Sequence, residues 1–250
     1  MRRVVRGFWG PRQESVETLA GRWKLTLDQL AELLPAAGSG AGSGSGSRAG
    51  AGAGEAWTWR NVPAPGPAAD LRTDEASLLA ALRAAQAADD WSDRTGCGLR
   101  LVAAGAPGWK IEVSGRAGGT PEILLQSMVI GISSPDGAEI PDAELLTVLA
   151  DVWEPDFGGV TDDDVLDALE DDAGFVVGEP SVGWVGYLSP ARAALLPDGM
   201  TAARKELRGG GVLLDIARRG DVDGVVQAYL RLREAGALRP LPRPMDRATL

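Results

Sequence analysis

The sequence predicts an α+β fold in a single domain, with a mainly antiparallel sheet and helices packed on it. Short apolar runs follow one another with tight turns between them, and they do not alternate strictly with helices. Other stretches have apolar residues three or four positions apart, which is typical of amphipathic helices. The 250 residues, with 44% hydrophobic and 24% charged residues, are enough to bury one large core.

The first expected elements are a strand and an amphipathic helix. Residues 4–9 form a short apolar run that ends at a Gly-Pro turn. Ser15 is a good helix N-cap, and apolar side chains then recur at helical spacing up to Pro35. Residues 36–54 are Gly, Ser and Ala with one Arg, which predicts a flexible insertion. A domain boundary is the alternative, but 35 residues are too few to fold alone.

A helix and three strands are expected next. Thr73 is expected to cap a helix that runs to about residue 90. The strands are expected at residues 98–103, 109–114 and 122–132. Ala106-Pro107-Gly108 suits a hairpin turn between the first two. Residues 110–114 alternate polar and apolar side chains, as a strand with one exposed face does.

The C-terminal half is expected to contain three helices, a strand and a hairpin. Pro141 opens a helix with an apolar face up to Trp153, and residues 154–159 break it. Thr161 is expected to cap a short acidic helix. The later elements are a strand at 182–188, a hairpin of 200–207 and 212–218, and a helix capped by Asp221 that ends at Gly236. The domain therefore covers residues 1–238, and residues 239–250 are expected to be a loose tail.

The absence of histidine and the single cysteine restrict the possible chemistry. They remove Ser-His-Asp and Cys-His catalysis, and one thiolate cannot form a tetrahedral zinc site. We therefore expect no catalytic residues, no cofactor and no metal, and we expect Cys97 to be a small buried side chain. A carboxylate-based hydrolase or modifying enzyme remains an alternative, because acidic residues are plentiful.

The negative charge is concentrated in the middle third of the chain. The net charge is -10, and residues 117–191 contain sixteen Asp and Glu but no Lys or Arg. Such a field repels nucleic acid and anionic lipid and attracts basic proteins, so we expect no nucleic-acid or membrane binding. The alternative is that these acids form only a solvated helix face. A cytoplasmic location is expected, because the N-terminus does not resemble a secretory signal and no apolar stretch reaches about 20 residues.

Three segments place a tryptophan near glycine or proline: residues 6–15, 153–161 and 183–189. With the glycine hairpin before Val212 and the closing helix, they occur in an order that resembles the immunity protein 52 family. Members of that family are immunity proteins of bacterial polymorphic toxin systems. The resemblance implies a protein that binds and neutralises a cognate toxin of the nuclease type, without catalysis. The insertion at 36–54 and the long acidic stretch 162–178 depart from the family pattern.

A nuclease toxin presents cationic side chains to phosphates, so the acidic middle third offers a route to capture it. The expected toxin contacts are seven carboxylates and one aromatic anchor: Asp156, Asp162, Asp163, Asp164, Asp167, Glu170, Asp171 and Trp184. The sequence leaves open whether the block is steric or reaches the toxin's active site, and it does not predict the oligomeric state. An adaptor protein with a non-toxin partner is a further alternative.

Overall fold

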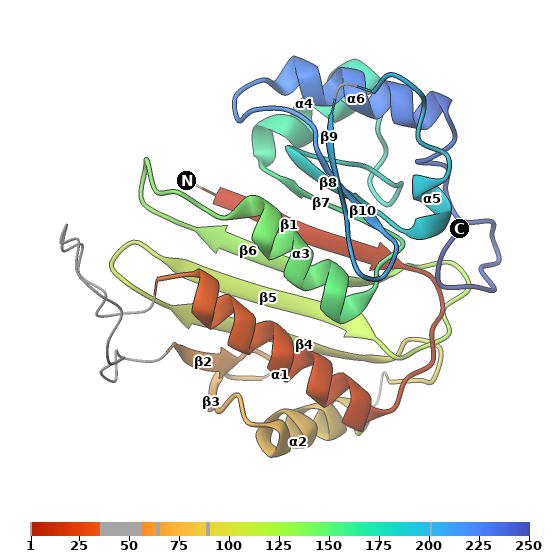
Figure 1. The fold of residues 1–250 in the computed structure, drawn as a ribbon. Helices are drawn as coiled ribbons and strands as arrows, with labels where there is room; N and C mark the ends of the chain where they lie inside the picture. The colour runs from red at the N-terminus through yellow and green to blue at the C-terminus, as the bar shows by residue number, and fades with distance from the viewer. Residues whose placement is uncertain (1, 36–56, 64–65, 89–90, 201) are drawn as a thin grey trace.

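The computed structural model describes residues 2–35, 57–63, 66–88, 91–200 and 202–250. The strands in these ranges are β1 (Arg2–Trp9), β2 (Thr58–Asn61), β3 (Ala69–Leu71), β4 (Cys97–Ala104), β5 (Lys110–Ala117), β6 (Gln126–Ser133), β7 (Phe157–Thr161), β8 (Val185–Leu188), β9 (Ala203–Glu206) and β10 (Val212–Asp215). They form one antiparallel sheet in the order β3-β2-β4-β5-β6-β1-β7-β8-β10-β9 (Figure 1). The α+β fold with an antiparallel sheet is therefore confirmed. The predicted insertion at 36–54 lies outside the described residues.

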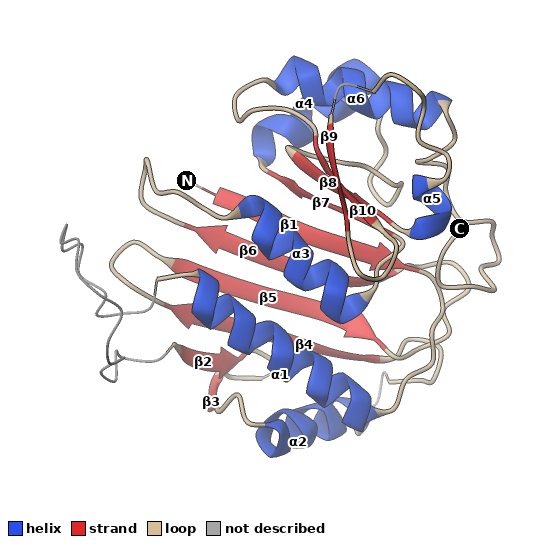
Figure 2. Ribbon diagram, in the orientation of Figure 1, coloured by secondary structure: helices blue, strands red, loops and turns tan. Residues whose placement is uncertain are grey.

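The helices cover opposite faces of the sheet in its two halves. They are α1 (Val16–Leu33), α2 (Glu75–Gln86), α3 (Asp142–Trp153), α4 (Asp163–Ala173), α5 (Pro190–Ala193) and α6 (Val222–Glu234). Helices α1 and α3 cross one face of the central strands, which we call the front face (Figures 1 and 2). Helices α4 and α6 pack on the back face of β7, β8 and β10. No helix in the described ranges has the length and apolar composition needed to cross a membrane.

Each face has its own apolar core. In the front core, Trp153 stacks on Trp9 with 5.7 Å between ring centroids and meets Trp23 edge-on at 5.9 Å. The back core lies under α4 and α6 and contains Phe157. Strand β1 contributes to both, because successive side chains of a strand point to opposite faces: Trp9 enters the front core and Phe8 packs on Phe157.

Three of the predicted helix starts are confirmed and two are shifted by one residue. Pro141 directly precedes α3, as predicted. The Ser15 and Asp221 side chains cap α1 and α6 as predicted. Helix α2 is capped by Asp74 and not by Thr73. Helix α4 is capped by Asp162 and not by Thr161, because Thr161 belongs to β7, where it pairs with Val4.

Strand β7 is the main element that the sequence analysis missed, since residues 154–159 were interpreted as a helix break. Glu154 does end α3 in a left-handed conformation with φ 47°, but the sheet resumes three residues later. Gly158 and Gly159 lie inside the sheet, where a Cβ on Gly158 would come within 2.6 Å of the Arg6 carbonyl oxygen. These glycines therefore allow a close backbone approach and do not mark a turn. The short strands β2 and β3 and the short helix α5 were also not predicted.

The C-terminal segment 239–250 packs against the domain, so the expectation of a loose tail is wrong. Leu241 and Met245 are buried, 5% exposed each. The Gly10 N–H donates to the Ala248 carbonyl at 2.8 Å. The proline-rich composition predicted looseness because prolines lack N–H donors, but apolar anchors and hydrogen bonds from the rest of the chain hold the segment.

Candidate protein-binding site

Helix α4 presents most of the predicted acidic residues to solvent on one side. Its other side, with Val165, Leu169 and Ala173, is buried in the back core. The exposed carboxylates, which we call the α4 acidic face, are Asp163, Asp164, Asp167, Glu170, Asp171 and Asp172. The helix itself contains no Lys or Arg. Five of these six residues are among the toxin contacts predicted from the sequence, and the structure brings them together on one surface.

In the described part of the chain, two arginines contact this helix, one at each end. Arg2 lies 3.7 Å from the Asp163 carboxylate at the first turn. Arg233 Nη1 donates to the Ala173 carbonyl at 2.7 Å at the last turn. Among the described residues, no Lys or Arg nitrogen comes within 4.0 Å of the other five carboxylates. The negative field of α4 is therefore largely uncompensated by the protein itself.

Asp162 and Trp184 stabilise the start of α4 from inside the protein. Asp162 Oδ2 accepts hydrogen bonds from Arg3 Nη1 at 2.7 Å and from Trp184 Nε1 at 3.1 Å. The other oxygen, Oδ1, accepts from the Val165 N–H and caps the helix. Trp184 is only 3% exposed and belongs to the back core. Its interpretation as an anchor for a partner is therefore corrected: Trp184 holds the capping carboxylate in place.

Asp156 is also an internal residue. Its carboxylate accepts a hydrogen bond from Arg192 Nη2 at 2.7 Å, and both side chains are completely buried. The Ser189 hydroxyl donates to the other carboxylate oxygen at 3.0 Å. A partner protein cannot reach this group in the folded chain, so Asp156 is removed from the predicted contact set.

Arginines from other parts of the chain neutralise several more acids of the middle third. Arg3 contacts Asp142 as well as Asp162, and Arg22 contacts Glu154 at 3.1 Å. The prediction of a wide anionic surface without positive charge is therefore wrong in its extent. The α4 acidic face is the largest group of middle-third acids without an ion pair in the described residues, and the arginines that neutralise other acids come from distant segments that a local charge count does not reveal.

Two exposed valines lie directly after α4. Val176 and Val177 are 60% and 80% exposed, and they follow the left-handed C-cap Gly174. A hydrogen bond from the Glu179 N–H to the Val176 carbonyl closes this turn. Exposed apolar side chains next to charged ones are typical of protein interfaces. The sequence analysis missed them, although a β-branched pair between Gly174 and Gly178 was a usable signal.

The carboxylate-enzyme alternative requires two acidic groups with raised pKa values in one pocket. Burial raises the pKa of Asp142, although Arg3 opposes this shift. Within the described ranges, no group of three or more acidic or thiol side chains is arranged to hold a metal. Cys97 is buried in β4, and burial raises the pKa of its thiol.

The crowding of acids at the end of α4 predicts a measurable stability effect. We expect Asp171→Lys to raise the free energy of unfolding by about 0.3–1 kcal/mol, because a cation replaces an anion near the carbonyl end of the helix dipole. Asp163→Lys, at the amino end, should lower the stability. Urea unfolding of the two purified variants would measure both effects. Equal shifts in the same direction would contradict the assigned helix polarity and exposure.

No family model matches this sequence, and no curated protein matches it. Among solved structures, the fold is similar to the Pseudomonas aeruginosa T6SS protein PA0821, with a TM-score of 0.49 and 15% sequence identity. The match covers 96% of this chain and 77% of that protein. A likeness this distant transfers no function to this chain.

Proposed function

We propose that this protein neutralises a basic protein toxin by binding it on the α4 acidic face. The observation that carries the proposal is the row of six exposed carboxylates on a helix without a cation, next to the exposed Val176 and Val177. Like charges at helical spacing repel one another and reduce stability. A cationic partner would relieve this repulsion, and the valines would supply apolar contact.

The proposed mechanism has two steps: electrostatic attraction brings the toxin to α4, and the bound protein then blocks the toxin's surface sterically. The uncompensated carboxylates accelerate the encounter with a positively charged surface, and the exposed location of α4 leaves room for a large partner. A nuclease must present a cationic surface to its substrate, so a protein bound there excludes the nucleic acid. The sequence resemblance to the immunity protein 52 family favours a toxin over the partner of a general adaptor. In this proposal the protein acts without catalysis and in the cytoplasm.

The proposal is tested with the protein encoded next to this chain's gene, because immunity genes ordinarily lie beside their toxin genes. Co-expression with the wild-type chain should restore the growth of cells that express that protein. The triple variant Asp164→Asn, Asp167→Asn, Asp171→Asn should protect poorly. We expect its affinity to fall about 10- to 100-fold, from about 0.5–1 kcal/mol for each exposed charge contact.

A matched control removes three exposed carboxylates elsewhere: Glu32→Gln, Asp198→Asn and Asp246→Asn. This control changes the net charge by the same amount and should protect as well as the wild type. Equal protection by the α4 variant and the control would contradict binding on α4. Binding of the neighbouring gene product without any toxicity of that product would favour the adaptor alternative.

A further inference from the structure

One half of the sheet has a back face that α4 and α6 do not cover, although α2 and Trp91 flank its edge at β4. Helices α1, α2 and α3 lie on the front face, while α4 and α6 cover the back face only from β7 onward. On β4, β5 and β6, buried residues alternate with partly exposed ones, which shows that one face is covered and the other is accessible. We call the back face of β2, β4, β5, β6 and β1 the open sheet face. The predicted alternation of residues 110–114 is thereby confirmed.

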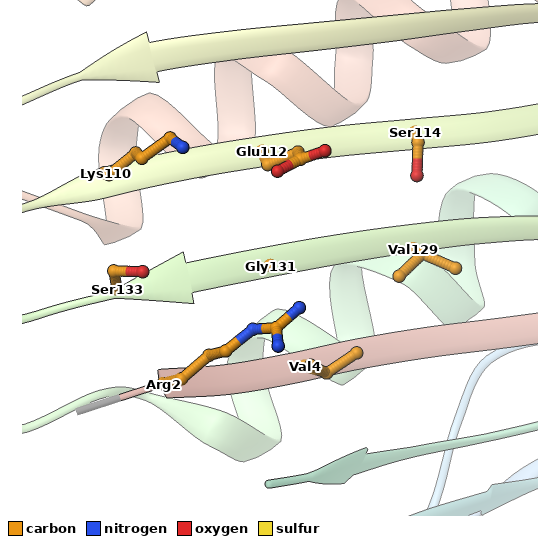
Figure 3. Close-up of a pocket in the computed structure, with 8 residues that line it drawn as sticks. All are labelled: Arg2, Val4, Lys110, Glu112, Ser114, Val129, Gly131 and Ser133. Carbon is orange, nitrogen blue, oxygen red and sulfur yellow. The ribbon is translucent and has the colours of Figure 1, made fainter. Parts of the chain in front are cut away.

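The strand register identifies the side chains of this face. Lys110, Ser133 and Arg2 lie side by side across β5, β6 and β1. They line a shallow pocket of about 190 Å³ (Figure 3). Small side chains such as Ser114 and Gly131 form its floor. Glu112 lines the same pocket, so charged side chains lie at the middle of this face as well as at its end.

The charge of the open sheet face is opposite to that of the whole protein. It carries six cations, Arg2, Arg6, Arg60, Arg100, Lys110 and Arg116, and one anion, Glu112. At its two borders, Arg60 contacts Asp70 of β3 at 3.5 Å and Arg2 contacts Asp163 at 3.7 Å. Glu112 forms an ion pair with Arg100, with 2.6 Å between Arg100 Nη2 and Glu112 Oε1. Lys110 and Arg116 are exposed, and no carboxylate of the described residues lies within 4.0 Å of them. A protein of net charge -10 thus has a sheet face on which two exposed cations, Lys110 and Arg116, are not neutralised by a described carboxylate.

The basic and acidic surfaces adjoin along β1. Arg2, on the open sheet face, reaches Asp163 at the start of α4. Arg6, two positions further along the same face, donates to the Ser181 hydroxyl at 2.9 Å in the segment that follows α4. Strand β1 is therefore the border between a cationic sheet surface and an anionic helix surface on the same side of the sheet.

We propose that two copies of this chain associate about a two-fold axis parallel to β1, with the α4 acidic face of each copy on the open sheet face of the other. Rotation about an axis along the border exchanges the two surfaces, so every contact occurs twice. The sizes agree. An 11-residue helix is about 16 Å long and about 10 Å wide. The eight-residue strands β4, β5, β6 and β1 form an area about 27 Å long and about 14 Å across.

A second copy fits this surface better than the other anionic partners. Nucleic acid binds exposed sheets largely by stacking on aromatic rings. Phe8, the aromatic side chain that the register places at this face, already packs on Phe157. The net negative charge also repels a polyanion. The chain itself supplies five carboxylates without an ion pair on α4, opposite the unpaired Lys110 and Arg116.

The dimer stands independently of the proposed toxin binding, although both use α4. If both exist, a second copy and a toxin compete for the same carboxylates, and the dimer becomes a storage form from which the toxin displaces one copy. The experiment for the dimer uses the purified chain alone, so its outcome does not depend on a toxin.

Sedimentation at about 0.15 M salt tests the dimer with two charge-reversed proteins. The sheet-reversed protein carries Lys110→Glu and Arg116→Glu, and the helix-reversed protein carries Asp167→Lys and Asp171→Lys. All four side chains are exposed, so both proteins should fold, which circular dichroism would verify. We expect the wild type to dimerise at micromolar concentration and each reversed protein alone to dimerise at least 30-fold more weakly.

An equimolar mixture of the two reversed proteins should form a heterodimer of nearly wild-type affinity. Each sheet–helix contact then again joins opposite charges. A wild type that stays monomeric up to 100-fold higher concentration would overturn the proposal. Failure of the mixture to associate, or unchanged dimerisation of either reversed protein, would likewise overturn it, because another surface would then be responsible.

Discussion

Arg192→Met is expected to lower the free energy of unfolding by about 3–5 kcal/mol, because it leaves the Asp156 carboxylate buried without its cation. Both side chains are 0% exposed, and their charged atoms are 2.7 Å apart. Arg192 Nη1 also donates to the carbonyls of Ala237 and Arg239. Replacing Arg192 therefore removes contacts both in the core and at the start of the C-terminal segment.

Urea unfolding measures this effect, with Arg218→Met as the control. Arg218 is exposed, so its replacement should change the stability by no more than about 0.5 kcal/mol. The double variant Asp156→Asn, Arg192→Met should recover part of the loss, because a neutral amide is less costly to bury than an unpaired carboxylate. Equal stabilities of Arg192→Met and the control would show that the pair is not buried as described.

Trp153→Ala is expected to destabilise the protein by about 3–5 kcal/mol, because it empties the largest site of the front core. Trp153 is 0% exposed and packs against both Trp9 and Trp23. Its Nε1–H donates to the Thr26 hydroxyl at 2.8 Å. Alanine would leave a cavity between two indole rings and remove the donor to a buried hydroxyl.

Thermal and urea unfolding of Trp153→Ala and Trp153→Phe would measure this contribution. Phenylalanine fills part of the space and should show an intermediate loss. Leu25→Ala is the control, because Leu25 is 52% exposed and its truncation should cost little. A Trp153→Ala protein as stable as this control would contradict the packing of the three tryptophans.

The sequence predicted the elements whose local pattern decides their structure. The alternation of residues 110–114 marked β5, and Ser15 marked the start of α1. Strand β7 was missed, because its Gly158 and Gly159 are required by the close approach of β1 and residue 183. That approach is a tertiary contact, and the local sequence contains only a turn-like glycine pair.

The predicted contact residues also form two groups: those that the local sequence places correctly and those that it misplaces. The exposed acids of α4 could be found from the sequence, because they follow one another on a short helix opposite Val165 and Leu169. Asp156 and Trp184 were misplaced, because their burial depends on partners distant in the chain: Arg192 for the first and Asp162 for the second. The open sheet face could not be predicted, because a strand pattern does not tell which sheet face the helices leave uncovered.

Hydrogen–deuterium exchange on the complex with the neighbouring gene product tests the central proposal most directly. Slower exchange is expected in α4 and in the turn with Val176 and Val177, because the proposed interface covers them. The amides of α1 and α3 on the front face should exchange as in the free protein. Protection confined to the front face, with α4 unchanged, would contradict capture by the α4 acidic face.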